Sequence, residues 1–271
     1  MLDLTVSIVT YKNSIEDLGP TVGSVLGSDL DLRLIMIDHS PDQSLRGRLP
    51  QDPRMEYYHH PENPGFGAGH NKAINQALSS SRYHLVLNPD VIFDPVILTK
   101  MFTYLENNDS IALLSPLVVY PSKEIQYLCK LLPTPVDAFL RRFFRGSQMM
   151  NRRNLRYEMR LTNYDRELDV PYLSGCFMFL RCSALKQIGG FDERFFMYYE
   201  DTDLTRRIHQ LYRTVFYPEV TIIHKFAKES HNFNRMFFAH IYSAIQYFNK
   251  WGWIFDDERV KINKIISCQF K

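Results

Sequence analysis

Hydrophobic positions along the first 120 residues follow two periods, one typical of strands and one typical of helices. Short β-branched and aliphatic runs predict strands at residues 4–10, 32–38, 55–60, 83–88 and 111–120. Between these runs the apolar residues recur with the period of a helix. This pattern predicts a helix after Pro20, in IEDLGPTVGSVLGS, and helices at residues 69–80 and 94–108. This alternation predicts an α/β domain with a mostly parallel sheet flanked by helices. Ligands on such a sheet bind at the carboxyl ends of the strands.

The pattern changes beyond residue 120. Residues 170–201 predict a strand, a helix and a Gly-Gly turn, and residues 214–224 predict a further strand after a helix begun by EDTDLTRRIHQL. From residue 232 onward the chain has the spacing of amphipathic helices. Because no repeat and no second core pattern is found, we expect one domain over residues 1–231 and a C-terminal helical extension over residues 232–271.

Two segments have an unusual composition. Residues 129–165 show little strand signal, and seven arginines stand against one glutamate between residues 141 and 160. Such a run is usually solvated or partly disordered, and the alternative is an arm that meets phosphates or anionic lipid. The tail is rich in aromatic residues, which either pack on the sheet or on a second subunit, or settle at a lipid interface.

The overall composition narrows the class of protein. A net charge of +2, from 32 Lys+Arg and 30 Asp+Glu among 271 residues, argues against a nucleic-acid partner. The N-terminus lacks the pattern of a secretory signal, and no window of about 18 uninterrupted apolar residues appears. We therefore expect a cytoplasmic protein whose four cysteines are reduced thiols, because none stands in a CxxC pair: Cys129, Cys176, Cys182 and Cys268.

Carboxylates follow two of the predicted strands. Asp38, in MIDHSPD, is placed to bind a nucleobase or ribose, although an Asp at this point often only caps a turn. Asp90, in LNPDV, follows a buried strand, and Mg2+ or Mn2+ could bridge it to a diphosphate. One carboxylate holds such a cation weakly, which is expected where substrate phosphates supply most ligands.

Glycines and acidic residues mark two further stretches. NPGFGAGHN, residues 63–71, has the spacing G-x-G-x-G rather than G-x-G-x-x-G, so a phosphate cradle and a flexible turn both remain open. FFMYYEDTDLTRR, residues 195–207, carries Glu200, Asp201 and Asp203, which suit the acidic first turn of a helix or supply a catalytic base.

Together these blocks, with VSIVTYKN, SGCFMFLRCSAL and VTIIHKFAKES, resemble the inverting family 2 glycosyltransferases. The resemblance covers roughly residues 4–250 and is greatest to bacterial rhamnosyltransferases of O-antigen or capsular polysaccharide assembly. It implies a GT-A fold, with a Rossmann-like sheet, and a divalent metal, Mg2+ or Mn2+. It also implies a nucleotide-sugar donor and a polyprenyl-diphosphate-linked glycan acceptor at the inner membrane surface.

The resemblance also assigns residues. Asp201 matches the catalytic base, with Glu200 beside it, and the proton of an acceptor hydroxyl needs such a base because the hydroxyl has a high pKa. Asp90 matches the metal ligand, and His224 falls where a histidine can approach the metal or diphosphate, or is a satisfied strand-end histidine. The remaining matches are nucleotide-binding residues, namely Thr10, Tyr11, Asp38, Gly67, Asn71 and Asn88, and the phosphate-stabilising candidates Arg206 and Arg207.

The resemblance leaves several alternatives open. The donor is expected to be dTDP-L-rhamnose, with a UDP-hexose or UDP-N-acetylhexosamine as the alternative. The block D-H-S-P-D replaces the common D-N-x-S, a departure that concerns the details of base recognition and not the fold. Other classes are a sugar-phosphate nucleotidyltransferase, which would carry a Gly-rich loop with Arg and Lys after the first strand, and a catalytically silent binding module. A homo-oligomer is a further possibility.

Overall fold

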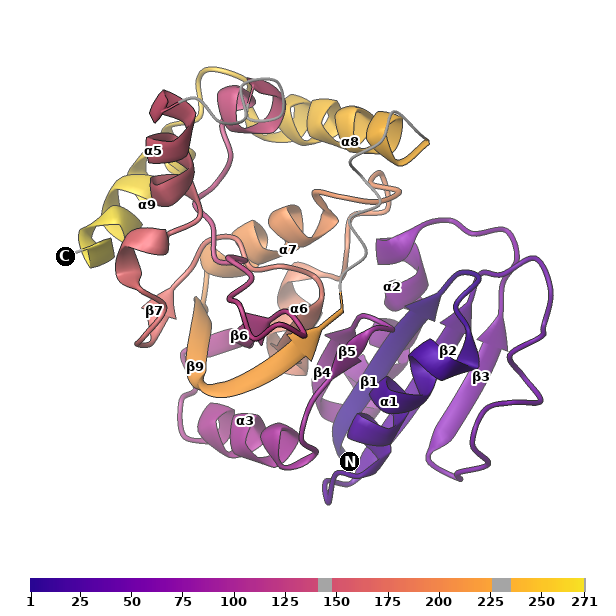
Figure 1. Ribbon diagram of the computed structural model, residues 1–271. Helices are drawn as coiled ribbons and strands as arrows, with labels where there is room; N and C mark the ends of the chain where they lie inside the picture. The colour runs from indigo at the N-terminus through magenta and orange to yellow at the C-terminus, as the bar shows by residue number, and fades with distance from the viewer. Residues whose placement is uncertain (141–147, 226–234, 271) are drawn as a thin grey trace.

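The computed structural model describes residues 1–140, 148–225 and 235–270, which form a sheet with helices on both faces (Figure 1). Within these residues the sheet has nine strands, in the order β3-β2-β1-β4-β8-β6-β9-β5, with β7 paired to β9. Its two faces carry separate hydrophobic clusters: in β8 (Phe177–Arg181), Phe177 and Phe179 enter one cluster, and Met178 and Leu180 the other. This alternation is the period of a strand buried on both sides.

The first four strands are parallel, as predicted. They are β1 (Leu2–Thr10), β2 (Leu32–Asp38), β3 (Met55–His59) and β4 (Ser81–Leu87). In the β1–β2 register Thr10 stands opposite Asp38, so both side chains reach the same edge. The connecting helices are α1 (Ile15–Leu26) and α2 (Phe66–Ser80).

Helix α1 begins before Pro20, not after it as the sequence pattern suggested. Ser14 caps the helix by accepting a hydrogen bond from the Asp17 N–H at 3.2 Å. Pro20 lacks the N–H that would bond to the Glu16 carbonyl. Because Glu16 and Pro20 are both exposed, that carbonyl can bond to water and the helix continues.

The C-terminal half of the sheet is mixed. Strand β8 lies antiparallel between β4 and β6 (Ile111–Val119), and β9 (Arg213–His224) runs parallel to β6. Short strands β5 (Val91–Ile92) and β7 (Leu168–Asp169) pair antiparallel with β9. The helices of this half are α3 (Val96–Glu106), α6 (Cys182–Ile188) and α7 (Glu200–His209).

In the described part of residues 129–165 the arginine-rich helix is largely exposed and the flanking segments are packed. This part contains α5 (Gln148–Tyr157) and the short helical segments Val136–Leu140 and Arg160–Thr162. Its buried side chains enter the same cluster as α7 and β9: Cys129, Leu131, Tyr157, Met159 and Tyr164. The arginine run itself is solvated where it is described, since Arg152, Arg156 and Arg160 are exposed, and Arg141, Arg142 and Arg145 lie outside the described residues.

The C-terminal extension consists of α8 (Arg235–Trp251), α9 (Asp257–Ile266) and a final turn, Ser267–Phe270. Tyr247 and Phe248 pack against Phe195 and Tyr199, which precede α7. The extension is therefore part of the same body, and the boundary expected at residue 231 lies outside the described residues. In the part of the chain that the structure describes, no helix is both long and apolar enough to cross a bilayer.

Candidate active site

Asp38 lies at the end of β2, fully buried, with both carboxylate oxygens in hydrogen bonds. Oδ2 accepts from the Tyr57 hydroxyl at 2.7 Å, and Oδ1 accepts from the Ser40 N–H at 2.8 Å and the Thr10 hydroxyl at 3.2 Å. Burial, followed by the bond to Asp38, raises the pKa of the Tyr57 hydroxyl. Tyr57 therefore remains a donor that fixes the Asp38 carboxylate at the strand end.

Tyr11 stands just beyond β1, with half of its side chain exposed. Lys12 follows it in the left-handed region, with φ 57°, and donates its N–H to the Ser40 hydroxyl at 2.8 Å. The Lys12 ammonium lies 5.3 Å from the centre of the Tyr11 ring. The half-exposed Tyr11 ring thus follows Thr10, the partner of Asp38, and a flat ring can stack on its open part.

Pairing of β5 with β9 brings Asp90 and His224 together, because Val91 stands opposite His224 in the register. The Asp90 Oδ1 lies 3.3 Å from the His224 Nε2, and the Asn88 Nδ2 lies 3.3 Å from the same nitrogen. Carboxylate oxygen and imidazole nitrogen both suit Mn2+, and the oxygen suits Mg2+. No group of three or more His, Cys, Asp or Glu that could hold a metal occurs in the described ranges. Asp90 and His224 together therefore fit a cation that takes its remaining ligands from a diphosphate.

Asp201 lies in the first turn of α7 and is held by backbone groups. Its Oδ2 accepts from the Gly175 N–H at 3.0 Å and its Oδ1 from the Thr202 N–H at 2.7 Å. Burial raises the pKa of Asp201, and these hydrogen bonds and the charge of Lys130 oppose the rise.

Glu200 is more strongly perturbed than its neighbour. It is 5% exposed, and its Oε2 has no hydrogen-bond partner among the residues described. Burial, with the charge of Asp201 added, raises the Glu200 pKa well above its ordinary value. Because two adjacent carboxylates resist ionising together, the pair favours an ionised Asp201 and a protonated Glu200.

A strained turn just before α7 positions the Glu200 and Asp201 carboxylates. Tyr198 and Tyr199 both have left-handed backbone, with φ 71° and 68°. Bulky residues rarely adopt this conformation, and such strain is held in place by surrounding packing. Gly65 (φ 108°) lies so close that a Cβ there would stand 2.2 Å from the Phe196 carbonyl oxygen, and the Phe66 N–H donates to that oxygen at 2.9 Å. The glycine-rich stretch therefore supports the acidic turn.

Gly67 and Asn71 make structural contacts, not contacts in a phosphate cradle. A Cβ on Gly67 would stand 2.8 Å from the Phe191 Cβ. The Asn71 side chain donates to the Phe191 carbonyl at 2.9 Å and accepts from the Phe191 N–H at 2.8 Å. Both residues thus join α2 to the loop that leads to Glu200.

The structure does not bring the two arginines to the site. Arg206 is 1% exposed and forms a bidentate pair with Asp256 at 2.7 and 2.8 Å. Arg207 bonds to Asp203 at 2.8 Å and to the Gly190 carbonyl at 2.6 Å. Neither guanidinium is available to a diphosphate, so their expected phosphate role is wrong.

Asp203 belongs to the acidic first turn of α7, as expected, and it also has long-range partners. It is fully buried, and its carboxylate also accepts from the Trp251 Nε1 and pairs with the Lys250 ammonium, at 2.8 and 2.7 Å. These two partners of the Asp203 carboxylate, Trp251 and Lys250, come from the C-terminal extension. Sequence spacing gave no signal for these long-range pairs.

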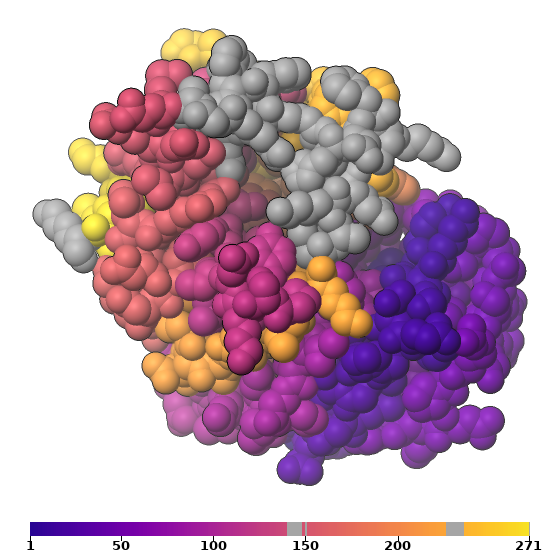
Figure 2. Space-filling model, in the orientation of Figure 1, coloured from indigo at the N-terminus to yellow at the C-terminus, as the bar shows by residue number. Residues whose placement is uncertain are grey.

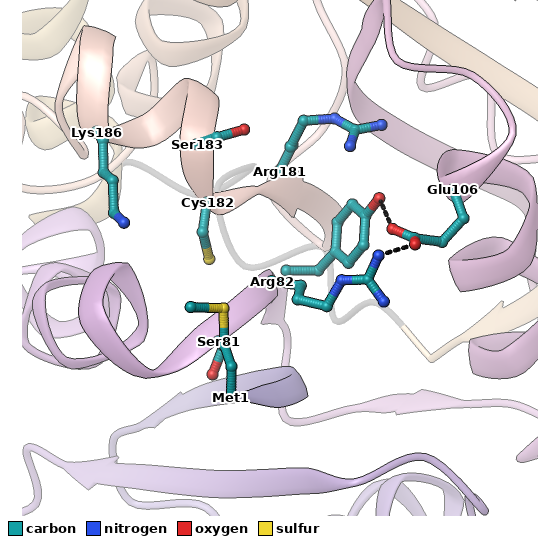
Figure 3. Close-up of a pocket in the computed structure, with 9 residues that line it drawn as sticks. Met1, Ser81, Arg82, Glu106, Arg181, Cys182, Ser183 and Lys186 are labelled. Atoms are coloured by element: carbon teal, nitrogen blue, oxygen red, sulfur yellow. Dashed lines mark hydrogen bonds and ion pairs between the residues drawn. The ribbon is translucent and has the colours of Figure 1, made fainter.

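A cavity of about 230 Å³ lies far from these residues (Figure 3). It is lined by Met1, Ser81, Arg82, Tyr83, Glu106, Arg181, Cys182, Ser183 and Lys186. Ser81 begins β4, whereas Asn88 follows its other end, so the cavity is at the amino ends of the strands. Ligands of such sheets bind at the carboxyl ends, and we assign the site there.

Two sequence profiles match the chain. One, described as Glycosyl transferase family 2, matches residues 5–189, and one described as the N-terminal domain of galactosyltransferase matches residues 155–232.

Curated relatives include two rhamnosyltransferases. An N-acetylglucosaminyl-diphospho-decaprenol L-rhamnosyltransferase of Mycobacterium tuberculosis is 25% identical over 211 residues, which cover 73% of this chain and 68% of the relative. Rhamnosyltransferase WbbL of Escherichia coli K12 is 28% identical over 196 residues, which cover 67% of this chain and 70% of the relative.

Solved structures share the fold. GalNAc-T7 with UDP, GalNAc and Mn2+ superposes with a TM-score of 0.69 at 14% identity, over 95% of this chain and 50% of its own. The mannosyltransferase PcManGT of Pyrobaculum calidifontis, with GDP-Man and Mn2+, gives 0.57 at 16% identity, over 90% of this chain and 64% of its own. This chain thus spans half the length of the GalNAc-T7 chain, and at these identities the likeness concerns the fold alone.

Proposed function

We propose an inverting sugar transfer for this chain, which belongs to glycosyl transferase family 2 and is a glycosyltransferase of the expected GT-A fold. The donor is a nucleotide-activated sugar and the acceptor a hydroxyl group. The observation that carries the proposal is the Asp201 carboxylate, held by the Gly175 and Thr202 N–H groups. A fixed, partly desolvated carboxylate is suited to act as a general base.

In the proposed reaction, Asp201 takes the proton of the acceptor hydroxyl as its oxygen bonds to the anomeric carbon. The bond from that carbon to the diphosphate oxygen breaks on the opposite side, so the configuration inverts and the nucleoside diphosphate leaves. The nucleoside binds beside the strand ends at Thr10 and Asp38, with Tyr11 stacking on its base, and the buried Asp38 carboxylate orders this edge through Thr10, Ser40 and Tyr57. Glu200, when protonated, donates a hydrogen bond to the acceptor.

Asp90 and His224 would hold a divalent cation, Mg2+ or Mn2+, with Asn88 beside them. When bound, such a cation neutralises negative charge on the leaving diphosphate. The 3.3 Å separation of the two donor atoms supports this assignment. The Mn2+ in the titles of the GalNAc-T7 and PcManGT structures belongs to those proteins and supports the choice of metal.

For the donor we propose dTDP-L-rhamnose, on the likeness to two rhamnosyltransferases. A UDP-hexose or UDP-N-acetylhexosamine is the alternative, since GalNAc-T7 was solved with UDP. A panel of dTDP, UDP, GDP and CDP compounds, with and without Mn2+, tests this by thermal stabilisation. A midpoint raised only by dTDP forms supports rhamnose, a rise with UDP forms alone overturns it, and no rise with any nucleotide overturns sugar transfer.

Two other classes are less well supported. A nucleotidyltransferase would carry a Gly-rich loop with Arg and Lys after the first strand, and VSIVTYKNSIEDLG has neither a glycine run nor an arginine. A silent binding module would lose nothing when Asp201 is replaced, whereas a glycosyltransferase would lose its rate of sugar transfer.

For the acceptor we propose a polyprenyl-diphosphate-linked glycan of surface polysaccharide assembly, reached at the inner face of the membrane. Support comes from large apolar side chains at the surface of the C-terminal extension: Ile254 and Phe255, 77% and 90% exposed, lie between α8 and α9. Such side chains bind at lipid interfaces. Co-sedimentation with anionic vesicles should fall in the Ile254→Glu, Phe255→Glu variant. Light scattering would reveal a homo-oligomer if this face instead joins two copies.

A further inference from the structure

Gln126 lies beside His224 although the two are far apart in the sequence. It is 4% exposed and follows β6, where its N–H donates to the Val118 carbonyl at 2.9 Å. Figure 2 shows the end of β9, in orange, at the surface next to the magenta segment around residue 125. Neither the family match nor the mechanism above gives this glutamine a role.

The orientation of the Gln126 amide follows from its contacts. Its Nε2 lies 2.7 Å from the His224 carbonyl oxygen, and a carbonyl oxygen only accepts hydrogen bonds. The amide NH2 must therefore face this carbonyl. The amide oxygen, Oε1, then faces the His224 Nδ1 at 3.0 Å.

This orientation fixes the histidine tautomer. Because Oε1 is an acceptor, the Nδ1 of His224 must carry the hydrogen, and in the neutral ring Nε2 carries a lone pair. The lone pair belongs to the nitrogen that lies 3.3 Å from the Asp90 Oδ1. Two acceptor atoms at this separation suit a shared cation.

We propose that Gln126 is a positioning residue that holds His224 in the Nδ1–H tautomer, so that Nε2 can ligate the divalent cation together with Asp90. The inference rests on the metal site of the proposed function. Without Gln126, His224 can take the other tautomer and donate Nε2–H to the Asp90 carboxylate. With the His224 Nε2–H bonded to the Asp90 carboxylate, neither residue could ligate the cation well. Partners of this kind typically change metal affinity by about 10- to 100-fold.

Two variants separate positioning from packing. Gln126→Met keeps the side-chain volume but removes the acceptor for Nδ1–H, whereas Gln126→Glu, protonated on the oxygen that faces the His224 carbonyl, keeps both that acceptor and a donor to the carbonyl. Thr5→Val is the matched control, because it removes a buried hydrogen bond to Ser81 between β1 and β4, which do not carry Asp90 or His224. The Mn2+ affinity of each protein is measured by the electron paramagnetic resonance of free Mn2+, in the presence of dTDP, or of UDP if the nucleotide panel favours it.

We expect Gln126→Met to weaken Mn2+ binding by about 10- to 100-fold. Gln126→Glu should stay within about threefold of the wild type or bind more tightly, and Thr5→Val should not change the affinity. Equal weakening in the Met and Glu variants, or no weakening in either, would overturn the role of Gln126. A wild-type protein that binds no Mn2+ would reject the metal site itself, and with it this role.

The tautomer has its own readout in the metal-free protein. Nitrogen-15 NMR of the His224 ring reports which nitrogen carries the hydrogen. We expect the hydrogen on Nδ1 in the wild type and a shift toward Nε2 in Gln126→Met. A hydrogen on Nε2 in the neutral wild-type ring would contradict the inference, whatever the metal does.

Discussion

The Gly175 N–H donates a hydrogen bond to the Asp201 Oδ2 at 3.0 Å and so holds the carboxylate in place. A Cβ on Gly175 would stand 3.3 Å from the Asp201 Cβ and 3.3 Å from the Phe66 ring. Gly175, two residues before β8, therefore leaves room for the proposed base.

Gly175→Ala should therefore displace Asp201 and lower kcat by about 10- to 100-fold, because small misplacements of catalytic groups are costly. Donor KM should change little, since Asp38 and Asp90 are untouched. Gly23→Ala, on the exposed face of α1, is the control, because a Cβ there meets no atom within 4 Å. Steady-state kinetics of both variants test this prediction. A kcat of Gly175→Ala equal to that of Gly23→Ala would show that Gly175 does not position Asp201.

Glu200→Gln should raise stability at neutral pH. The folded-state pKa of Glu200 lies well above 4.5, so the folded protein binds a proton more tightly there than the unfolded chain does. Stability from this group is therefore lost as pH rises from about 4.5 toward that raised pKa. A glutamine at position 200 carries no charge, so the variant does not lose this stability as the pH rises.

Thermal melts of Glu200→Gln and wild type at pH 4 and pH 7 check the sign. The difference in Tm should be larger at pH 7 than at pH 4. A difference that grows as pH falls would mean that Glu200 is stabilised as a carboxylate, and the assignment of the proton to Glu200 would then be wrong.

Arg206→Met should cost about 3–5 kcal/mol of unfolding free energy, because it leaves the buried Asp256 without its bidentate partner. The Trp251 ring, whose centre lies 4.0 Å from the guanidinium carbon, loses its stacking partner as well. Arg48→Gln is the control: its pair with Glu16 is exposed and should contribute about 1 kcal/mol or less.

Urea unfolding measures both arginine variants. Where Arg206→Met is still folded, its donor KM should match the wild type, since the guanidinium joins α7 to the C-terminal extension. A large rise in donor KM without a loss of stability would restore the phosphate role for Arg206.

Local sequence signals were sufficient for the parallel half of the sheet. The aliphatic runs at residues 4–10 and 32–38 are strands, and Thr10 and Asp38 meet at their carboxyl ends. The direction of β8 was not predictable, because a buried run has the same composition in either orientation. The start of α1 was missed because an exposed carbonyl tolerates Pro20 inside the helix.

The site was predictable only in part. Asp90 was singled out by its place after a strand and Asp201 by a family resemblance rather than by spacing, and both roles stay predictions. Arg206 looked like a phosphate ligand because its partner Asp256 lies 50 positions away. Gln126, 98 positions from His224, stands outside any regular pattern, so only the structure reveals their contact.

The central claim is that Asp201 is the general base of sugar transfer, and Asp201→Asn tests it most directly. With the nucleotide sugar that most stabilises the wild type, kcat should fall by about 10²- to 10⁴-fold while nucleotide and Mn2+ affinities stay unchanged. Transfer at close to the wild-type rate would contradict the account and require another base.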